Sequence, residues 1–208
     1  MTQEWIKAID LEKKLYHPYF DEELQFLQRH ITKGNLIDLG CGNGRISQEL
    51  NGKYSYYTGI DIDPELVKEL NQTKNNTVKY LHSDVCKLPF DNGKFDTSLC
   101  LTTYSNFGPQ LGQMLQESSR ILKEKGTFIG SCFHEDALEK RLELYSQFGD
   151  IIKNVDHRGN VSFKEGMETD ISCQYTQNEI QKDLEKQGFS LESIKKSGPF
   201  YLFKAVKK

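Results

Sequence analysis

The chain lacks the features that mark several large classes of protein. It has no apolar run near the roughly 20 residues of a membrane-spanning helix, and its first residues lack the basic start and apolar core of a signal peptide. A net charge of −3 gives no general attraction for nucleic acid or for an anionic membrane. We therefore expect a cytoplasmic protein with no membrane partner, and the charge argues against nucleic acid as a partner.

Cysteine pairs and metal-binding spacings are also missing. The five histidines are scattered, so no zinc site and no other metal site is expected. No Cys-x-x-Cys pair occurs among the five cysteines, which are Cys41, Cys86, Cys100, Cys132 and Cys173. Three of these lie in or beside apolar, strand-like runs, which predicts buried free thiols in a reducing compartment.

What the chain does have is a regular alternation of strand-like and helix-like segments. The predicted strands span residues 35–39, 54–60, 78–82, 97–101 and 127–132, and predicted helices begin at residues 45, 64 and 111. Alternation of this kind indicates parallel βαβ units in a doubly wound sheet. The stretch between the third and fourth strands is short and contains Pro89 and Gly93, so we expect little helix there. The length of 208 residues suits a single α/β domain.

The two ends of the chain depart from this alternation. Helical spacing over residues 3–30 is interrupted at Pro18, which predicts two short helices. After residue 132 we expect an inserted segment of about 45 residues, with a helix over 135–148 and a hairpin between 160–163 and 171–175. A capping box, Thr176-Gln177-Asn178-Glu179, predicts the start of the last helix. Residues 189–197 and 200–206 predict a terminal hairpin that adds one antiparallel strand to the sheet.

The glycine-rich turn after the first strand carries the most information, in the segment Leu36-Ile37-Asp38-Leu39-Gly40-Cys41-Gly42-Asn43-Gly44. Glycines let a backbone turn sharply and approach a ligand where a Cβ would collide. A dinucleotide-binding turn would have glycine where this chain has Arg45, and the Gly-Lys-Ser/Thr end of a P-loop is missing. Asp38 would repel a pyrophosphate and suits a cofactor that carries positive charge. Asp61 follows the second strand at the spacing of a ribose-binding acid, so we expect a nucleoside-bearing cofactor.

These residues resemble the class I S-adenosylmethionine-dependent methyltransferases. Four motifs occur in the family's order, each at one end of its own strand: Asp38-Leu39-Gly40-Cys41-Gly42-Asn43-Gly44, Gly59-Ile60-Asp61-Ile62-Asp63-Pro64, Ser83-Asp84-Val85 with Leu88-Pro89-Phe90, and Phe95-Asp96. The resemblance covers roughly residues 33–132 and the terminal hairpin. It implies an enzyme that binds S-adenosylmethionine, transfers its methyl group to N, O or C of a small molecule, and releases S-adenosylhomocysteine.

The resemblance also implies a set of cofactor-binding residues: Asp38, Gly40, Cys41, Gly42, Gly44, Asp61, Ile62, Asp84, Val85, Leu101, Tyr16 and Tyr19. In this set Asp61 takes the ribose hydroxyls, Ile62 packs on the adenine, and Asp84 accepts from the adenine amino group. Two alternatives remain open. Asp61 or Asp63 could instead cap the helix that begins at Pro64, and the N-terminal tyrosines could pack their helix on the sheet.

Catalytic residues are harder to predict, because in-line methyl transfer depends mainly on holding the nucleophile close and aligned. A base is needed only when the nucleophile starts protonated. Tyr104 and His134 are the candidate catalytic residues, and the candidate substrate-binding residues are Tyr104, Asn106, His134 and Tyr175. For His134 the alternative is an ordinary histidine at a helix start or on the surface. The Asn/Asp-Pro-Pro-Tyr/Phe motif of amino-methylating nucleic-acid enzymes is missing after the fourth strand.

The expected architecture is therefore α/β: a doubly wound, seven-stranded, mostly parallel sheet in one methyltransferase domain. Its expected parts are an N-terminal helical lid (1–32), a cofactor-binding core (33–132), a cap (133–176), and a final helix with the terminal hairpin (177–208). Three other functions stay open: a methyltransferase acting on tRNA or protein through a basic cluster at Lys153, Arg158 and Lys164, a non-catalytic cofactor-binding subunit, and, least favoured, a dinucleotide oxidoreductase. The sequence sets neither the methyl acceptor nor the oligomeric state.

Overall fold

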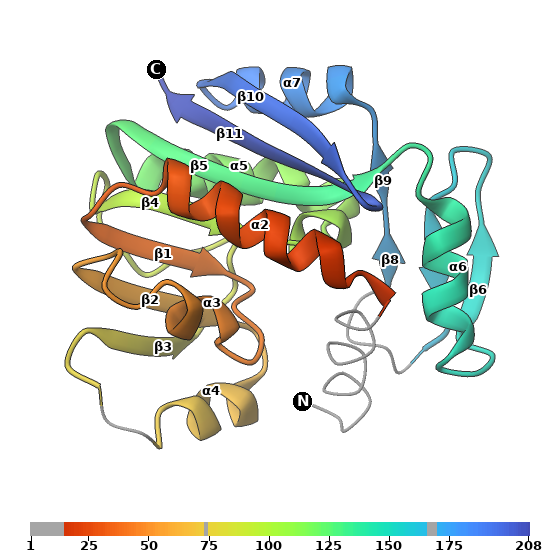
Figure 1. The fold of residues 1–208 in the computed structure, drawn as a ribbon, viewed down its shortest axis with the longest axis horizontal. Helices are drawn as coiled ribbons and strands as arrows, with labels where there is room; N and C mark the ends of the chain where they lie inside the picture. The colour runs from red at the N-terminus through yellow and green to blue at the C-terminus, as the bar shows by residue number, and fades with distance from the viewer. Residues whose placement is uncertain (1–14, 73–74, 166–169) are drawn as a thin grey trace.

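The computed structural model describes residues 15–72, 75–165 and 170–208 (Figure 1). A central sheet runs in the order β10-β11-β5-β4-β1-β2-β3. Its strands are β1 (Asn35–Leu39), β2 (Tyr56–Asp61), β3 (Val78–His82), β4 (Phe95–Cys100), β5 (Leu122–His134), β10 (Phe189–Ser197) and β11 (Phe200–Lys207). The pairs among β5, β4, β1, β2 and β3 are parallel, and β11 lies antiparallel between β5 and β10. The expected doubly wound sheet with one antiparallel strand is confirmed.

Helices cover both faces of this sheet (Figure 1). One face carries α2 (His17–His30), α3 (Arg45–Glu49) and α4 (Pro64–Leu70), and the other carries α5 (Leu111–Ile121) and α7 (Gln177–Lys186). Side chains alternate between the faces along a strand. Leu36 and Leu99 accordingly pack in the cluster with α2, whereas their neighbours Ile37 and Cys100 pack in the cluster with α5. Burial on both faces explains the continuous apolar runs of the sequence.

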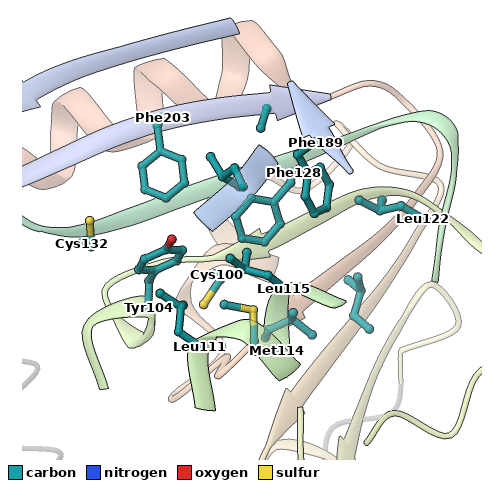
Figure 2. Packing of buried hydrophobic residues seen from close by; sticks show 14 of the residues in the cluster. Cys100, Tyr104, Leu111, Met114, Leu115, Leu122, Phe128, Cys132, Phe189 and Phe203 are labelled. Carbon is teal, nitrogen blue, oxygen red and sulfur yellow. The ribbon is translucent and has the colours of Figure 1, made fainter. Parts of the chain in front are cut away.

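Figure 2 shows the core between the sheet and α5, where aromatic rings fill the space. Phe203 of β11 lies over Gly130 of β5, and a Cβ placed on Gly130 would stand 2.3 Å from the Phe203 Cζ atom. Tyr104 is fully buried beside this ring, with ring centroids 5.3 Å apart in an edge-on arrangement. Gly130 therefore makes room for the ring that closes this part of the core.

The segment after β5 forms a small unit beside the main sheet (Figure 1, right). We call this unit, residues 135–173, the cap. It contains α6 (Leu138–Ser146) and a sheet in the order β6-β7-β8, made of β6 (Ile152–Val155), β7 (Val161–Phe163) and β8 (Ile171–Ser172). The antiparallel pairing of β7 with β8 is the predicted hairpin. Strand β6 was not predicted, and the predicted strand over 171–175 is split, because β9 (Gln174–Tyr175) leaves the cap and pairs with β5.

Several element boundaries follow from single residues. Helix α2 begins at His17, so Pro18 stands in its first turn, where a proline needs no N–H partner. The interruption predicted at Pro18 is thus a helix start, and the helix predicted before it lies outside the described residues. The capping box is confirmed, since Thr176 accepts from the Glu179 N–H and Glu179 accepts from the Thr176 N–H.

The connection between β3 and β4, residues 83–94, contains no helix, as Pro89 and Gly93 predicted. It is held instead by Arg120 of α5, whose guanidinium donates to the carbonyl oxygens of Phe90 at 2.6 Å and Leu88 at 3.0 Å. Two short 3₁₀ turns, η1 (Thr103–Asn106) and η2 (Gly108–Gln110), follow β4. Among the described residues no helix has both the length and the apolar character needed to cross a membrane.

Candidate functional site

The parallel strands end together at one edge of the sheet. Leu39 pairs with Ile60, Asp61 pairs with His82, and Asp38 pairs with Leu99. The segments that directly follow these strands therefore meet at this edge, which we call the carboxyl edge. This register brings together the glycine turn, Asp61 with Ile62, Asp84 with Val85, and Leu101. Ligands of open α/β sheets bind in this position.

The glycine turn lies close against its neighbours. Gly40, Gly42 and Gly44 all have positive φ angles, of 75°, 51° and 73°, a region in which residues with a Cβ are strained. The backbone N–H groups of Gly40 and Cys41 donate to the Ile60 carbonyl oxygen at 2.8 and 2.9 Å. A Cβ on Gly40 would stand 2.6 Å from the side chain of Thr103. The turn is thus set by backbone contacts that only glycine permits.

Asp61 is tied to the glycine turn. Its Oδ2 accepts from the Gly42 N–H at 2.9 Å, and its Oδ1 accepts from the Asp63 N–H at 3.1 Å. Burial raises the pKa of Asp61, opposed by the Gly42 N–H. The cap of α4 is Asp63, whose Oδ1 accepts from the N–H groups of Glu65 and Leu66. Asp63 therefore fills the helix-capping role, and Asp61 faces the glycine turn.

Two further residues at this edge are accessible to a ligand. Ile62 directly follows Asp61 and keeps 61% of its surface exposed, which is unusual for a large aliphatic side chain. Asp84 is exposed, with Oδ1 accepting from the Cys86 N–H at 2.8 Å. Val85 beside it is half-buried and packs on the core. An apolar surface between two carboxylates is thus open to solvent at the ends of β2 and β3.

Asp38 is a buried carboxylate on the face covered by α2. Only 2% of its surface is exposed, and its Oδ2 accepts from the Tyr57 hydroxyl at 2.6 Å. Burial raises the pKa of Asp38 to about 6, while the Tyr57 hydroxyl and the positive charge of Arg45 act in the opposite direction. A nearby cation would favour its ionised form.

An ion pair that the sequence did not predict joins α2 to the end of the glycine turn. Arg45 directly follows Gly44, and its guanidinium binds Glu23 of α2 at 2.5 Å and Glu49 at 2.7 Å. Glu23 is fully buried and also accepts from the Tyr19 hydroxyl at 2.6 Å. In the sequence Arg45 was informative only as a residue that breaks the dinucleotide pattern. Nothing in the spacing of α2 marks Glu23 as buried.

The end of β4 contains a strained turn. Thr102 has φ 56° and ψ −43°, and the Thr103 N–H donates to the Leu101 carbonyl oxygen at 2.6 Å. This is a γ-turn with positive φ at its central residue, a rare and strained form, and such strain costs on the order of 1–3 kcal/mol. The Ser131 hydroxyl holds the turn by accepting from the Thr102 N–H at 2.7 Å. Backbone strain of this kind is common at functional sites. Here the strained turn is followed by Thr103, whose side chain lies against Gly40.

The two candidate catalytic residues, Tyr104 and His134, are both buried. Tyr104 has no exposed surface, and its hydroxyl has no hydrogen-bond partner among the residues that the structure describes. The His134 Nδ1 accepts from the Asp136 N–H at 3.0 Å, so its Nε2 donates to the Gly198 carbonyl oxygen at 3.1 Å. With both nitrogens bonded, His134 ties the end of β5 to the terminal hairpin. A catalytic role for either residue stays a prediction.

The remaining predicted site residues are placed as follows. Tyr175 is buried and packs edge-on against Tyr104, with ring centroids 5.3 Å apart. Asn106 ends η1 and is half-buried. Tyr16 and Tyr19 both pack on Phe200, and the Tyr16 hydroxyl donates to the Lys140 carbonyl oxygen at 2.8 Å. Their predicted contact with a cofactor stays a prediction. Among the described residues no group of His, Cys, Asp and Glu has the arrangement of a metal site.

The comparisons with known proteins agree with this geometry. A family model described as a methyltransferase domain matches residues 37–130, which include the glycine turn and strands β2 to β4. Over these residues the chain is similar to a methyltransferase domain, in agreement with its resemblance to the class I S-adenosylmethionine-dependent methyltransferases. The cofactor of this class is S-adenosylmethionine, as expected.

Three relatives with similar sequences carry different functional names. An uncharacterized protein of Methanocaldococcus jannaschii is 30% identical over 139 residues, covering 64% of each chain. A human mitochondrial arginine hydroxylase, NDUFAF5, is 36% identical over 104 residues, which cover 49% of this chain and 29% of the human protein. A ubiquinone biosynthesis O-methyltransferase of Coxiella burnetii is 24% identical over 169 residues, 71% of each chain. The chain thus spans less than two thirds of the length of the first two relatives.

Solved structures show the same fold. A protein solved in complex with the Trm112 methyltransferase activator of Haloferax volcanii superposes with a TM-score of 0.73 at 16% identity. The superposition covers 96% of this protein and 93% of that chain. Identity at this level carries the fold and leaves the acceptor open.

Proposed function

We propose that the protein transfers the methyl group of S-adenosylmethionine to a small-molecule acceptor. The observation that carries the proposal is the carboxyl edge. There a glycine turn with positive φ angles, a half-buried Asp61 and an exposed Ile62 stand side by side at the ends of β1 and β2. The cofactor supplies a methyl group already activated by a sulfonium charge. The chain's own residues therefore have to bind and align.

The residues present fit this cofactor. The free lone pairs of Asp61 suit two ribose hydroxyls, and hydrogen bonds to an ionised acceptor are each worth about 1.5–3 kcal/mol. Ile62 offers an apolar surface for one face of the adenine, and Asp84 retains an acceptor oxygen for its amino group. Asp38 stabilises the cationic amino-acid end, and the backbone from Gly40 to Gly44 approaches without a Cβ in the way. These assignments are proposals for binding measurements to test.

Alignment of the acceptor falls to the strained turn after β4. The γ-turn at Thr102 presses Thr103 against Gly40, so the loop that follows β4 is held at a fixed distance from the glycine turn. Orientation by a rigid loop of this kind lowers the barrier to an in-line displacement by up to about 7–11 kcal/mol. Leu101 and Asn106, on either side of the turn, are the residues we place next to the reacting groups.

A small acceptor is supported by the charges of the cap. In the predicted basic cluster, Arg158 pairs with Glu179, and the Lys164 ammonium lies 2.5 Å from Asp150. Acidic partners thus neutralise two of the three charges that would have to bind a phosphate backbone.

Free thiols, four of them buried, are consistent with a reducing compartment, and we propose a cytoplasmic location.

The first experiment is a calorimetric titration of the purified protein with S-adenosylmethionine and S-adenosylhomocysteine, with NADH as the control. We expect micromolar binding of both adenosyl ligands and no binding of NADH. Release of S-adenosylhomocysteine during incubation with an acceptor panel then measures turnover. This readout also separates methyl transfer from hydroxylation, the activity in the human relative's name, because hydroxylation releases no S-adenosylhomocysteine. Absence of adenosyl binding would overturn the proposal.

A macromolecular acceptor is the second candidate, favoured by one observation: the fold match to a protein solved with a methyltransferase activator. Under this alternative the chain would act only with a partner, on tRNA or protein. Binding of tRNA that falls steeply as salt rises would support it. Turnover of small acceptors by the isolated chain would exclude a strict requirement for a partner.

A further inference from the structure

Arg141 of α6 is fully buried in the cap. Its Nη1 donates to the Gly159 carbonyl oxygen at 2.8 Å and to the Gln174 Oε1 at 3.1 Å. Its Nη2 donates to the Ser172 carbonyl oxygen and, at 2.9 Å, to the Ser172 hydroxyl. The guanidinium thus joins α6, the turn before β7, and strands β8 and β9.

The charge of Arg141 has no anionic partner among the described residues. All four of its acceptors are neutral, and no ion pair of the described chain includes it. Its fifth donor, the Nε–H group, is buried and has no hydrogen-bond partner. Arginine is almost never fully buried without an opposite charge, because burial of an unpaired ion carries a large desolvation cost. Among the described residues, Arg141 therefore has one uncompensated positive charge and one unused donor.

This guanidinium lies close to the proposed acceptor site. Its Cζ stands 4.9 Å from the centroid of the Phe133 ring, near the end of β5. The Phe133 N–H donates to the Ser105 hydroxyl at 3.0 Å, and the Cys173 N–H donates to the Ser105 carbonyl oxygen at 2.7 Å. Ser105 belongs to η1, which directly follows the strained turn at the end of β4. Two short chains of contact therefore link Arg141 to the loop that aligns the acceptor.

We propose that the methyl acceptor carries a carboxylate, and that Arg141 recognises it through its Nε–H group. The inference rests on the proposed function and adds the chemical class of the substrate. A carboxylate carries one negative charge, which balances the single positive charge of Arg141, and it accepts the one donor that remains. Because Arg141 has no exposed surface, entry of the acid requires a shift of the cap side chains around it.

The test compares matched acids and amides on the complex with S-adenosylhomocysteine. The probes are 4-hydroxybenzoate with 4-hydroxybenzamide and 3-phenylpropionate with 3-phenylpropionamide, which within each pair differ in the charged group. For the wild-type complex we expect the acids to raise the melting temperature and to bind at least tenfold tighter than the amides. Arg141→Gln should abolish this preference, and Arg141→Lys, which keeps the charge, should retain part of it. Arg158→Gln removes the cap arginine that pairs with Glu179 and should leave the preference unchanged.

A second measurement uses the wild-type protein and so does not depend on the Arg141→Gln variant being able to fold. The Nε–H signals of arginine are observable by nuclear magnetic resonance, and the chain has few arginines to assign; the others are Arg29, Arg45, Arg120 and Arg158. Addition of the acids should move the Arg141 Nε–H signal downfield, whereas the amides should leave it in place.

The outcomes separate the two proposals. Loss of S-adenosylhomocysteine binding in the wild-type protein would overturn the proposed function. Intact S-adenosylhomocysteine binding with equal affinity for acids and amides, or with a preference that survives Arg141→Gln, would overturn the carboxylate inference alone. A stationary Nε–H signal on addition of the acids would overturn it as well.

Discussion

The carboxyl edge of the sheet and the cap are built in opposite ways. At the edge, positions follow from backbone register, since the ends of β1, β2 and β3 are aligned residue by residue and glycines bring the chain into contact. In the cap, a small three-stranded sheet is supplemented by one buried side chain, Arg141, which binds segments up to 33 residues away in sequence. A site made from backbone register suits a cofactor shared by a whole family. A unit that includes one buried charged side chain suits a ligand that differs between members.

The carboxyl edge nevertheless depends on one buried ion pair, and removing one partner is the most disruptive change we expect. Arg45→Met leaves the fully buried Glu23 without its cation, which should lower the free energy of unfolding by about 3–5 kcal/mol. Urea denaturation measures the loss. The double variant Glu23→Gln with Arg45→Met removes both charges and should recover part of it. A double variant that is no more stable than Arg45→Met would show that the unpaired charge of Glu23 does not cause the loss of stability.

Cofactor affinity should depend on Asp61 and not on its neighbour. Asp61→Ala removes the ribose acceptor and the partner of the Gly42 N–H, so binding of S-adenosylhomocysteine should weaken by roughly 2–4 kcal/mol in calorimetry. Asp63→Ala is the matched control. It removes the cap of α4 and should cost about 1 kcal/mol of stability with little change in affinity. Equal losses of affinity in the two variants would show that the ribose-binding role does not belong to Asp61 in particular.

Acid should weaken cofactor binding through Asp38. Its raised pKa of about 6 means that binding of a cationic group below pH 6 must first displace a proton. Affinity for S-adenosylhomocysteine should therefore fall by roughly tenfold from pH 7 to pH 5 and level off above pH 7. The folded state also keeps this proton longer than the unfolded chain does, so the Asp38 contribution to stability falls as pH rises from about 4 to 6. A flat affinity profile from pH 5 to 7 would contradict this role, and Asp38→Asn should produce one.

A change confined to the cap should leave the carboxyl edge intact. Ser172→Ala removes the hydroxyl that accepts from Arg141 and from Tyr145, which should cost about 1–2 kcal/mol of stability. Calorimetry should find the affinity for S-adenosylhomocysteine within about twofold of wild type. A large loss of affinity would show that the two regions are coupled, and the contrast between them would no longer hold.

The same contrast explains which parts of the molecule were predictable from sequence. The sheet, the glycine turn and the position of Asp61 follow from local patterns, namely alternating apolar runs, alternate glycines and an acid after a strand. Strand β6 was missed because its burial pattern is mostly exposed and gives no apolar alternation. The predicted strand over 171–175 was split, because two neighbouring pairs of residues join different sheets, a choice that only tertiary packing makes.

Side-chain roles were predictable only where a backbone position sets them. Tyr104 and His134 stand near the ends of β4 and β5, where chemistry was expected, yet the first packs between Phe203 and Tyr175 and the second bonds to backbone through both nitrogens. Their side-chain directions depend on distant segments of the chain. The same holds for Glu23 and Arg141, whose sequence neighbours give no sign that either charge is buried.

The gap that Gly130 leaves for Phe203 has a consequence for how this chain can evolve. Neither position can change alone, because a side chain on Gly130 would collide with the ring and a smaller residue at position 203 would leave a void. Relatives that place alanine or serine at position 130 should therefore carry a smaller residue at position 203. These two sites, 73 positions apart, should vary as a pair across the family.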